Sequence, residues 1–247
     1  MIKSLNIKKK LVSAALLAAS IGSIGIAHAG DDDKPWYIGG SINASDIGDI
    51  NTTSTAQLAG VSRTIDIGND DDIGFGIKVG KVITKSTNGN EFNLELSHSE
   101  VNNDTESLVF NGNSFVGAAV EGQVETRTTL LRALYKFETG AIDPYIGLGL
   151  GQTDLDVDVR YGGSVGTNTG SQPPFTSGGD SVFAIQYRIG GEWGISEKVG
   201  VFLEYTRTEV DDVDFSRIGG GPGGLATTTQ TGDFEIDSVN IGVNFRF

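Results

Sequence analysis

The sequence predicts an all-β protein, an eight-stranded antiparallel up-and-down transmembrane β-barrel. Three observations predict it: strict alternation of apolar and polar residues over the last ten positions, seven further segments with the same period, and connections that are alternately short and long. A period of two places successive side chains on opposite faces of a strand. In an up-and-down barrel the short connections all lie at one end and the long ones at the other.

The final segment, residues 238–247, gives the clearest alternation. Its apolar face consists of Val239, Ile241, Val243, Phe245 and Phe247, and its polar face of Ser238, Asn240, Gly242, Asn244 and Arg246. An apolar strand edge in water invites aggregation, and chain ends usually fray. Both problems disappear if the apolar face meets lipid and the edge pairs with the first strand. We therefore expect this segment to close the barrel.

Eight segments alternate in this way, and each is close to the length that a tilted strand needs to cross a bilayer. They are residues 36–44, 73–83, 91–99, 124–137, 144–153, 182–193, 199–208 and 238–247. We expect these to be the strands of the barrel, in this order.

The first four segments each have a face of apolar or small residues that is expected to meet lipid. This face consists of Trp36, Ile38, Gly40, Ile42 and Ala44; Ile73, Phe75, Ile77 and Val79; Phe92, Leu94 and Leu96; and Thr129, Leu131, Ala133, Tyr135 and Phe137. The alternate positions carry charged residues, polar residues and glycines, so they are expected to face the interior.

The last four segments repeat the pattern. Their apolar faces consist of Ile146, Leu148 and Leu150; Phe183, Ile185, Tyr187, Ile189 and Trp193; Val201, Leu203 and Tyr205; and the five apolar residues of the final segment. In the fifth segment the opposite face is Tyr145, Gly147, Gly149 and Gly151. These glycines would leave room for long side chains from neighbouring strands.

The connections sort by length with strict parity. Residues 84–90, 138–143 and 194–198 are short turns, whereas about 45–71, 101–122, 154–180 and 209–233 are long, polar and rich in Gly, Asn, Asp, Ser and Thr. A soluble sandwich has no reason to sort its loops in this way. We expect four long loops at one end of the barrel and both chain termini at the other.

The first 29 residues are expected to be a secretory signal peptide that is removed. Four lysines lie within the first ten residues, residues 11–26 are apolar and small, and Ala27-His28-Ala29 matches a small-x-small cleavage pattern. The apolar stretch is too short to span a bilayer as a helix. The barrel domain is then expected to comprise residues 30–247.

Acidic residues dominate the expected mature chain, with 32 Asp and Glu against the 14 Lys and Arg that remain of 18 once the four leader lysines are removed, a net charge of −18. Such a surface repels nucleic acid, so no nucleic-acid partner is expected. There is no cysteine, which excludes disulfides and thiolate metal sites.

The inward positions carry nine charged residues, five cations and four anions. They are Lys78, Glu91, Glu95, Arg132, Lys136, Arg188, Glu192, Glu204 and Arg246. Eight strands enclose an interior that side chains can fill, and charges in such a space are costly unless they are paired. We expect a mutually satisfied charge network that plugs the interior. The alternative is a narrow ion path gated by rearranged ion pairs.

Eight aromatic residues lie at strand ends next to a short turn or a terminus. They are Trp36, Phe92, Tyr135, Phe137, Tyr145, Trp193, Phe245 and Phe247. Because these strand ends share one side of the barrel, we expect an aromatic girdle at that membrane interface. The parity of Tyr145 is inward, unlike that of the others.

No catalytic, cofactor or metal residues are expected. His98 lies between two serines, but strand neighbours point to opposite faces, so a Ser-His pair is not formed. Asp154, Asp156 and Asp158 resemble the start of a calcium loop, yet Val159 stands where that loop needs glycine. Similar acidic clusters occur at residues 70–72 and 211–214.

The chain resembles the small eight-stranded outer-membrane β-barrel family, which includes the transmembrane domain of outer-membrane protein A and the opacity-type surface proteins. The resemblance rests on Pro35-Trp36-Tyr37-Ile38-Gly39-Gly40, on Pro144-Tyr145-Ile146-Gly147-Leu148-Gly149 and on the terminal Phe247. It implies export through the periplasm to the outer membrane of a Gram-negative-type bacterium. It also implies that Phe247 is the assembly signal read by the barrel-assembly machinery.

The family includes envelope-stabilising proteins, adhesins and immune-evasion factors, and the motifs do not separate these roles. We expect a monomer with a structural or adhesin-like surface-binding role, surrounded by outer-membrane lipid and lipopolysaccharide, that contacts an unidentified extracellular ligand through its loops. Divalent cations that bridge the acidic clusters to lipopolysaccharide are an alternative to freely solvated loops. A small ion-conducting channel is the second expectation, and a lipid-modifying enzyme the third.

Overall fold

The computed structural model describes residues 35–47, 50–55, 62–69, 72–110, 113–116, 120–161, 176–221 and 224–247. The regular elements in these ranges are strands, and none of the described residues forms a helix long and apolar enough to cross a membrane. The strands are β1 (Trp36–Ile47), β2 (Ile50–Thr55), β3 (Ser62–Asn69), β4 (Asp72–Lys85), β5 (Glu91–Phe110), β6 (Asn113–Val116), β7 (Val120–Lys136), β8 (Asp143–Tyr161), β9 (Thr176–Gly194), β10 (Val199–Gly221) and β11 (Gly224–Arg246).

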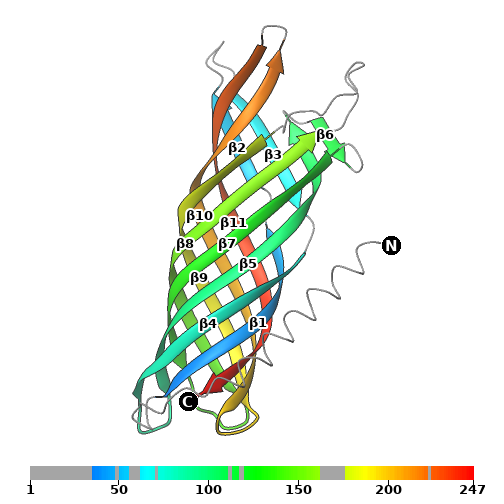
Figure 1. Cartoon of the computed structure of the whole chain (residues 1–247). Coiled ribbons are helices and arrows are strands. Elements are labelled where there is room, and N and C mark those ends of the chain that lie inside the picture. Colours follow the sequence, from blue (N-terminus) through cyan, green and yellow to red (C-terminus); the bar gives the residue numbers. More distant parts are fainter. Residues whose placement is uncertain are drawn as a thin grey trace, which may run out of the picture.

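Eight long strands form a closed antiparallel barrel, which confirms the predicted fold class. Neighbours pair in the order β1, β4, β5, β7, β8, β9, β10 and β11, and β11 pairs again with β1. The strands are strongly tilted, and the C-terminus lies at the end opposite β2, β3 and β6 (Figure 1). At the closing seam Ile42 pairs with Ile241, and Gly40 with Val243, as the terminal alternation predicted.

Backbone hydrogen bonds between β1 and the end of the chain extend the closing seam to Phe247. The backbone N–H of Trp36 donates to the carbonyl of Phe247 at 3.1 Å, and the N–H of Phe247 donates to the carbonyl of Trp36 at 2.9 Å. A terminal residue held by two backbone hydrogen bonds does not fray. The last residue is therefore part of the wall.

The strands are much longer than predicted, and the predicted loop boundaries are wrong. β8 and β9 have 19 residues each, and β10 and β11 have 23 each, so residues 154–161 and 176–180 and most of 209–233 are paired sheet. In the segment 101–122, β5 continues to Phe110, β6 follows, and β7 already begins at Val120. A transmembrane strand needs only about 9–11 residues, so half of each long strand lies beyond a membrane's reach.

A hairpin of β2 and β3 continues the wall above β1 and β4, within the predicted loop 45–71. β2 pairs with β11 through Thr53 and Thr231, and β3 pairs with β5 through Ile67 and Leu108. β2 thus pairs with β11 above the point where β1 ends, and β3 pairs with β5 above the point where β4 ends. At this upper level β6 pairs with β5 beyond the last pair of β5 with β7, which joins Asp104 and Gln123.

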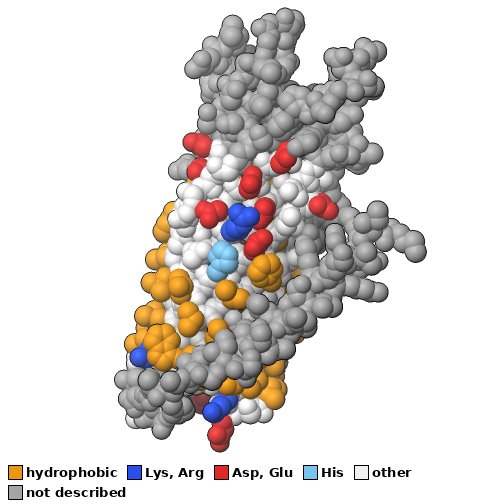
Figure 2. Space-filling model, viewed as in Figure 1, with side chains coloured by type: hydrophobic (Ala, Val, Ile, Leu, Met, Phe, Trp, Pro, Cys, Tyr) orange, Lys and Arg blue, Asp and Glu red, His pale blue; other side chains and the backbone are white. Residues whose placement is uncertain are grey.

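The polarity of the wall reverses halfway along the strands. On β8, Ile146, Leu148 and Leu150 lie on the outside, but the next outward residues are Gln152 and Asp154. Figure 2 shows the consequence: hydrophobic side chains cover the lower part of the described surface, and Asp, Glu and Arg side chains gather above them. An apolar exterior suits lipid and a charged exterior suits water, so the membrane boundary runs between these two zones.

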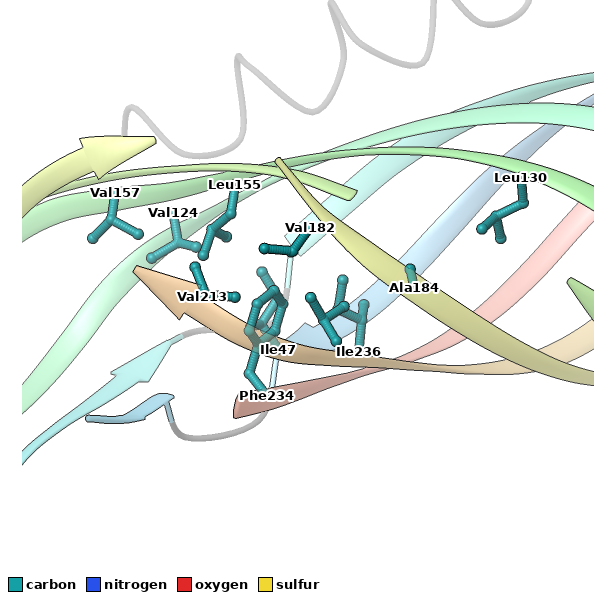
Figure 3. Packing of buried hydrophobic residues seen from close by; sticks show 11 residues of the cluster. Ile47, Val124, Leu130, Leu155, Val157, Val182, Ala184, Val213, Phe234 and Ile236 are labelled. Atoms are coloured by element: carbon teal, nitrogen blue, oxygen red, sulfur yellow. The ribbon is translucent and has the colours of Figure 1, made fainter. Parts of the chain in front are cut away.

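The polarity of the inward-facing side chains changes in the opposite direction. Below the boundary the inward side chains are mainly polar, whereas above it they form an apolar cluster. The cluster consists of Ile47, Val124, Leu130, Leu155, Val157, Val182, Ala184, Val210, Val213, Phe234 and Ile236. Figure 3 shows most of these side chains pointing toward one another from different strands, while Leu130 and Ala184 lie farther along the barrel. The upper half therefore packs as a water-soluble barrel does, with its core inside.

Candidate functional site

The lower charge cluster lies near the end of the barrel that carries the short turns, where β5, β7, β9 and β11 bring two glutamates and two cations together. Lys136 Nζ lies 2.9 Å from Glu91 and 3.6 Å from Glu192, and Arg246 lies 3.3 Å from Glu91 and 3.1 Å from Glu192. The Asn244 side chain donates to Glu192 at 2.6 Å. Each carboxylate faces both cations, and the exposed Lys85 also lies 3.6 Å from Glu91.

The upper charge cluster is centred on Arg188, which is fully buried. Its guanidinium bridges Glu95 on β5 and Glu204 on β10. Lys78 Nζ lies 3.5 Å from Glu95 and 3.7 Å from the centroid of the Phe202 ring. Such a bridge stabilises both carboxylates at once, because charged hydrogen bonds are strong where water is excluded.

Two tyrosines complete the upper cluster. The Tyr37 hydroxyl donates to Glu95 at 2.8 Å, and the Tyr145 hydroxyl donates to Glu204 at 2.7 Å. Placing Tyr145 in the aromatic girdle was wrong, because its ring is buried in the lumen. Tyr37 was not singled out, although its inward parity next to an outward Trp36 was the available signal. A tyrosine suits this place because its ring fills space while its hydroxyl satisfies a buried acceptor.

The lumen tyrosines lie over glycines of adjacent strands. A Cβ atom added to Gly80 would lie 2.3 Å from the Tyr37 ring, and one added to Gly190 would lie 2.7 Å from the Tyr145 ring. Real atoms do not approach so closely, so these positions exclude any side chain. Glycine is required here for the close approach of the ring.

We predict that Gly190→Ala destabilises the barrel by about 1–3 kcal/mol, because the added methyl forces Tyr145 out of its place beside Glu204. Urea unfolding in lipid vesicles measures the effect. The matched control is Gly194→Ala on the same strand, where an added Cβ meets nothing within 4 Å. Equal effects at the two positions would contradict the prediction.

Arg132 differs from the other lumen cations. It is buried on β7, yet no carboxylate of the described residues lies within 4 Å of it, and its Nε has no hydrogen-bond partner among them. It lines a polar cavity of about 30 Å³ together with Lys78, Gln186 and Glu204. The structure thus places all nine predicted charges inside the barrel but joins only eight of them in ion pairs.

Seven of the eight aromatic residues predicted for the girdle lie on the outer surface near the short turns. Trp36, Tyr135, Phe137 and Trp193 are exposed, and Phe92, Phe245 and Phe247 are half-buried. The rings of Tyr135 and Phe137 meet edge to face at 4.9 Å, and Lys81 Nζ lies 5.1 Å from the Trp36 ring. Rings with a polar neighbour suit the membrane interface.

The outer wall carries the remaining candidates. His98 Nδ1 lies 2.9 Å from Thr129 Oγ1 on the outside, while the flanking Ser97 side chain is buried inside. Asp154 accepts hydrogen bonds from Gln152 and Ser181. Among the residues that the structure describes, no three His, Cys, Asp or Glu side chains are grouped to hold a metal ion. The side chains of the predicted clusters at 70–72 and 211–212 lie outside the described residues.

Comparison with known proteins agrees with this geometry. The family model described as "Outer membrane protein beta-barrel domain" matches residues 14–247. The outer membrane protease OmpT from Escherichia coli superimposes with a TM-score of 0.57 at 8% identity, covering 90% of this chain and 99% of that chain. Such low identity shows the fold alone.

Smaller barrels are also similar. Neisserial surface protein A matches with a TM-score of 0.45 at 12% identity, over 86% of this chain and 97% of that chain. Ail, the attachment invasion locus protein of Yersinia pestis, matches with a TM-score of 0.41 at 11% identity, over 87% of this chain and 97% of that chain. No curated protein matches the sequence. Because the family model spans nearly the whole length, the chain belongs to the outer membrane protein β-barrel family, whose place is the outer membrane of Gram-negative bacteria.

Proposed function

We propose that this protein is a closed outer-membrane barrel that binds a partner at the cell surface through the upper half of its wall and the strand ends above it. The observation that carries the proposal is the reversal of polarity along the strands. A barrel that only anchors itself needs strands of about 9–11 residues, whereas β10 and β11 have 23. The extra length builds a rigid water-exposed platform, and surface loops on rigid scaffolds commonly carry binding sites.

The filled interior favours binding over conduction. The two charge clusters occupy the lower lumen, and the apolar cluster occupies the upper half. An ion would have to break buried pairs and then cross an apolar core, and both steps cost several kcal/mol. A small channel therefore remains the weaker alternative. A lipid-modifying enzyme is weaker still, because His98 has a threonine rather than a catalytic partner beside it.

Other partners remain predictions. These are lipopolysaccharide around the wall, the barrel-assembly machinery at Phe247, and a monomeric state. The acidic outer residues that include Asp154 and Asp156 would face the lipid headgroups or the water just above them.

Truncation of the longest hairpin tests the proposal. Val210 on β10 pairs with Phe234 on β11, so a short turn can join them and remove the hairpin above. We expect the truncated protein to remain a heat-modifiable barrel in detergent. A non-adherent bacterial host that displays the full chain is expected to adhere to immobilised extracellular-matrix proteins, and the truncated variant is expected to lose that adhesion.

Planar-bilayer recording provides the second arm of this test. The full chain is expected to give no steady single-channel openings. Steady openings that Glu204→Gln abolishes would identify a channel and overturn the proposal, as would adhesion that is the same with and without the displayed protein. Insertion of two residues into the turn at 86–90 is the control, because it changes the opposite end of the barrel.

A further inference from the structure

The two charge clusters of the lumen differ in where their unmatched cation lies. In the lower cluster Glu91 and Glu192 face the lumen cations Lys136 and Arg246, and the additional cation beside Glu91, Lys85, is exposed. In the upper cluster Glu95 and Glu204 face three cations, Lys78, Arg132 and Arg188. One positive charge is therefore left over, and it lies in the buried part of the membrane-spanning barrel.

The surplus charge belongs to Arg132. Its register partner across β5 is Glu95, but that carboxylate is turned toward Arg188, Lys78 and Tyr37. Its register partner across β8 is Gly149, which has no side chain to offer. The carboxylates nearest the guanidinium, Glu95 and Glu204, are thus already engaged by other cations and by tyrosine hydroxyls. A buried charge in this condition costs several kcal/mol unless another group offsets it.

The cavity beside Arg132 has the right size and chemistry to supply that group. Its volume is about 30 Å³, and Lys78, Ser41, Ser97, Thr128 and Gln186 contribute polar atoms to its lining. A water molecule needs about 10–15 Å³ by this measure, so the space is large enough for one halide ion together with a water. Glu204 also lines the cavity, and its negative charge is offset by Arg188 and by the Tyr145 hydroxyl.

We propose that this cavity is a binding site for one chloride-sized monovalent anion, held by the Arg132 guanidinium. The anion offsets the remaining positive charge of the upper cluster. Because Arg132 lies on β7, the anion also connects this strand to the upper cluster. The proposal does not depend on what the cell-surface end of the barrel binds.

Bromide provides a direct test with the unaltered protein. The cavity is lined mainly by buried side chains, so the chain is unfolded in urea and refolded into detergent in sodium bromide, which lets the ion enter before the barrel closes. Crystals of this protein are expected to show an anomalous bromide peak in contact with Arg132. Electron density for water alone at this position, without an anomalous peak, would overturn the proposal.

A stability measurement provides an independent arm. An ion that binds only the folded barrel raises the unfolding midpoint as its concentration rises. At constant ionic strength, replacing gluconate with chloride is expected to shift the urea midpoint of the wild-type protein upward. Arg132→Gln is expected to remove this shift, and Arg132→Lys is expected to retain part of it.

Arg127→Gln is the matched control, because Arg127 lies on the same strand but on the exposed outer face. This variant is expected to keep the full chloride dependence. A wild-type midpoint that does not respond to chloride, or a response that disappears equally in the Arg127 variant, would show that no specific anion site exists. If Arg132→Gln does not fold, the bromide crystals of the wild-type protein still decide the question.

Discussion

Replacing Arg188 with methionine is expected to destabilise the barrel by about 3–5 kcal/mol, which is the usual cost of removing one partner from a buried ion pair. The Arg188 side chain is fully buried and joins two carboxylates on opposite sides of the lumen. Methionine fills most of the same volume, so the loss is mainly electrostatic. Glu95 keeps Lys78 and Tyr37, whereas Glu204 keeps the Tyr145 hydroxyl but no ion pair with a described residue. Equilibrium unfolding by urea in lipid vesicles gives the free energy.

A second substitution separates charge from packing. Glu204→Gln in the Arg188→Met background removes the carboxylate that lost its ion pair and is expected to recover part of the lost stability. The surface control is Arg127→Gln, because Arg127 pairs with Glu125 at the exposed outer wall. Exposed pairs contribute about 0–1 kcal/mol, so this variant is expected to change little. If both arginine variants cost the same, the lumen network does not hold the strands together.

The membrane half of the barrel could be predicted from the sequence because one rule governs it. Lipid demands an apolar exterior, so the parity of Leu148 or Ile241 decides the direction of every other side chain in its strand. The closing pair of β1 and β11 follows from the same rule, since only these two strands lack a neighbour in sequence. The nine lumen charges were found for the same reason.

The upper half was missed because the rule reverses there. The run Asp154-Leu155-Asp156-Val157-Asp158 was interpreted as an acidic loop with a resemblance to a calcium site. It is a strand, in which Leu155 and Val157 are 1% and 0% exposed while Asp154 and Asp156 lie outside. Its period of two was visible in the sequence. The apolar side of an alternating strand faces outward in lipid but inward in water. The sequence does not mark where the membrane ends, so it does not show which of the two applies.

The pairing within the lumen could not be predicted by any reading of single strands. Register shifts around a tilted barrel decide which inward residues meet, and these shifts accumulate over all eight strands. Arg188 on β9 reaches Glu95 on β5, which is 93 positions earlier, while Arg132 stands opposite Glu95 in the register and does not pair with it. Tyr145 was misplaced for a related reason, because its position at a strand end suggested the girdle while its parity placed it in the lumen.

An arginine scan along the outer face of β8 is expected to locate the membrane boundary. Leu148→Arg places a charge in the lipid and is expected to cost about 2–4 kcal/mol, whereas Asp156→Arg is expected to change stability by no more than about 0.5 kcal/mol. Both positions face outward on the same strand, and both side chains are exposed. The variants therefore place the same side chain on the same face of one strand at two heights. Unfolding in lipid vesicles measures both.

The loss of unfolding free energy caused by arginine is expected to fall most steeply between positions Leu150 and Asp154. Gln152→Arg is expected to have an intermediate effect. Leu148→Gln is the control for lost hydrophobicity, since it removes the apolar side chain without adding a charge. The scan also tests the proposed binding platform, because that platform requires the wall above Asp154 to stand in water. Should Asp156→Arg cost as much as Leu148→Arg, the acidic zone would lie within the membrane. The long strands would then serve a thicker span, and the upper wall would not be available to a partner.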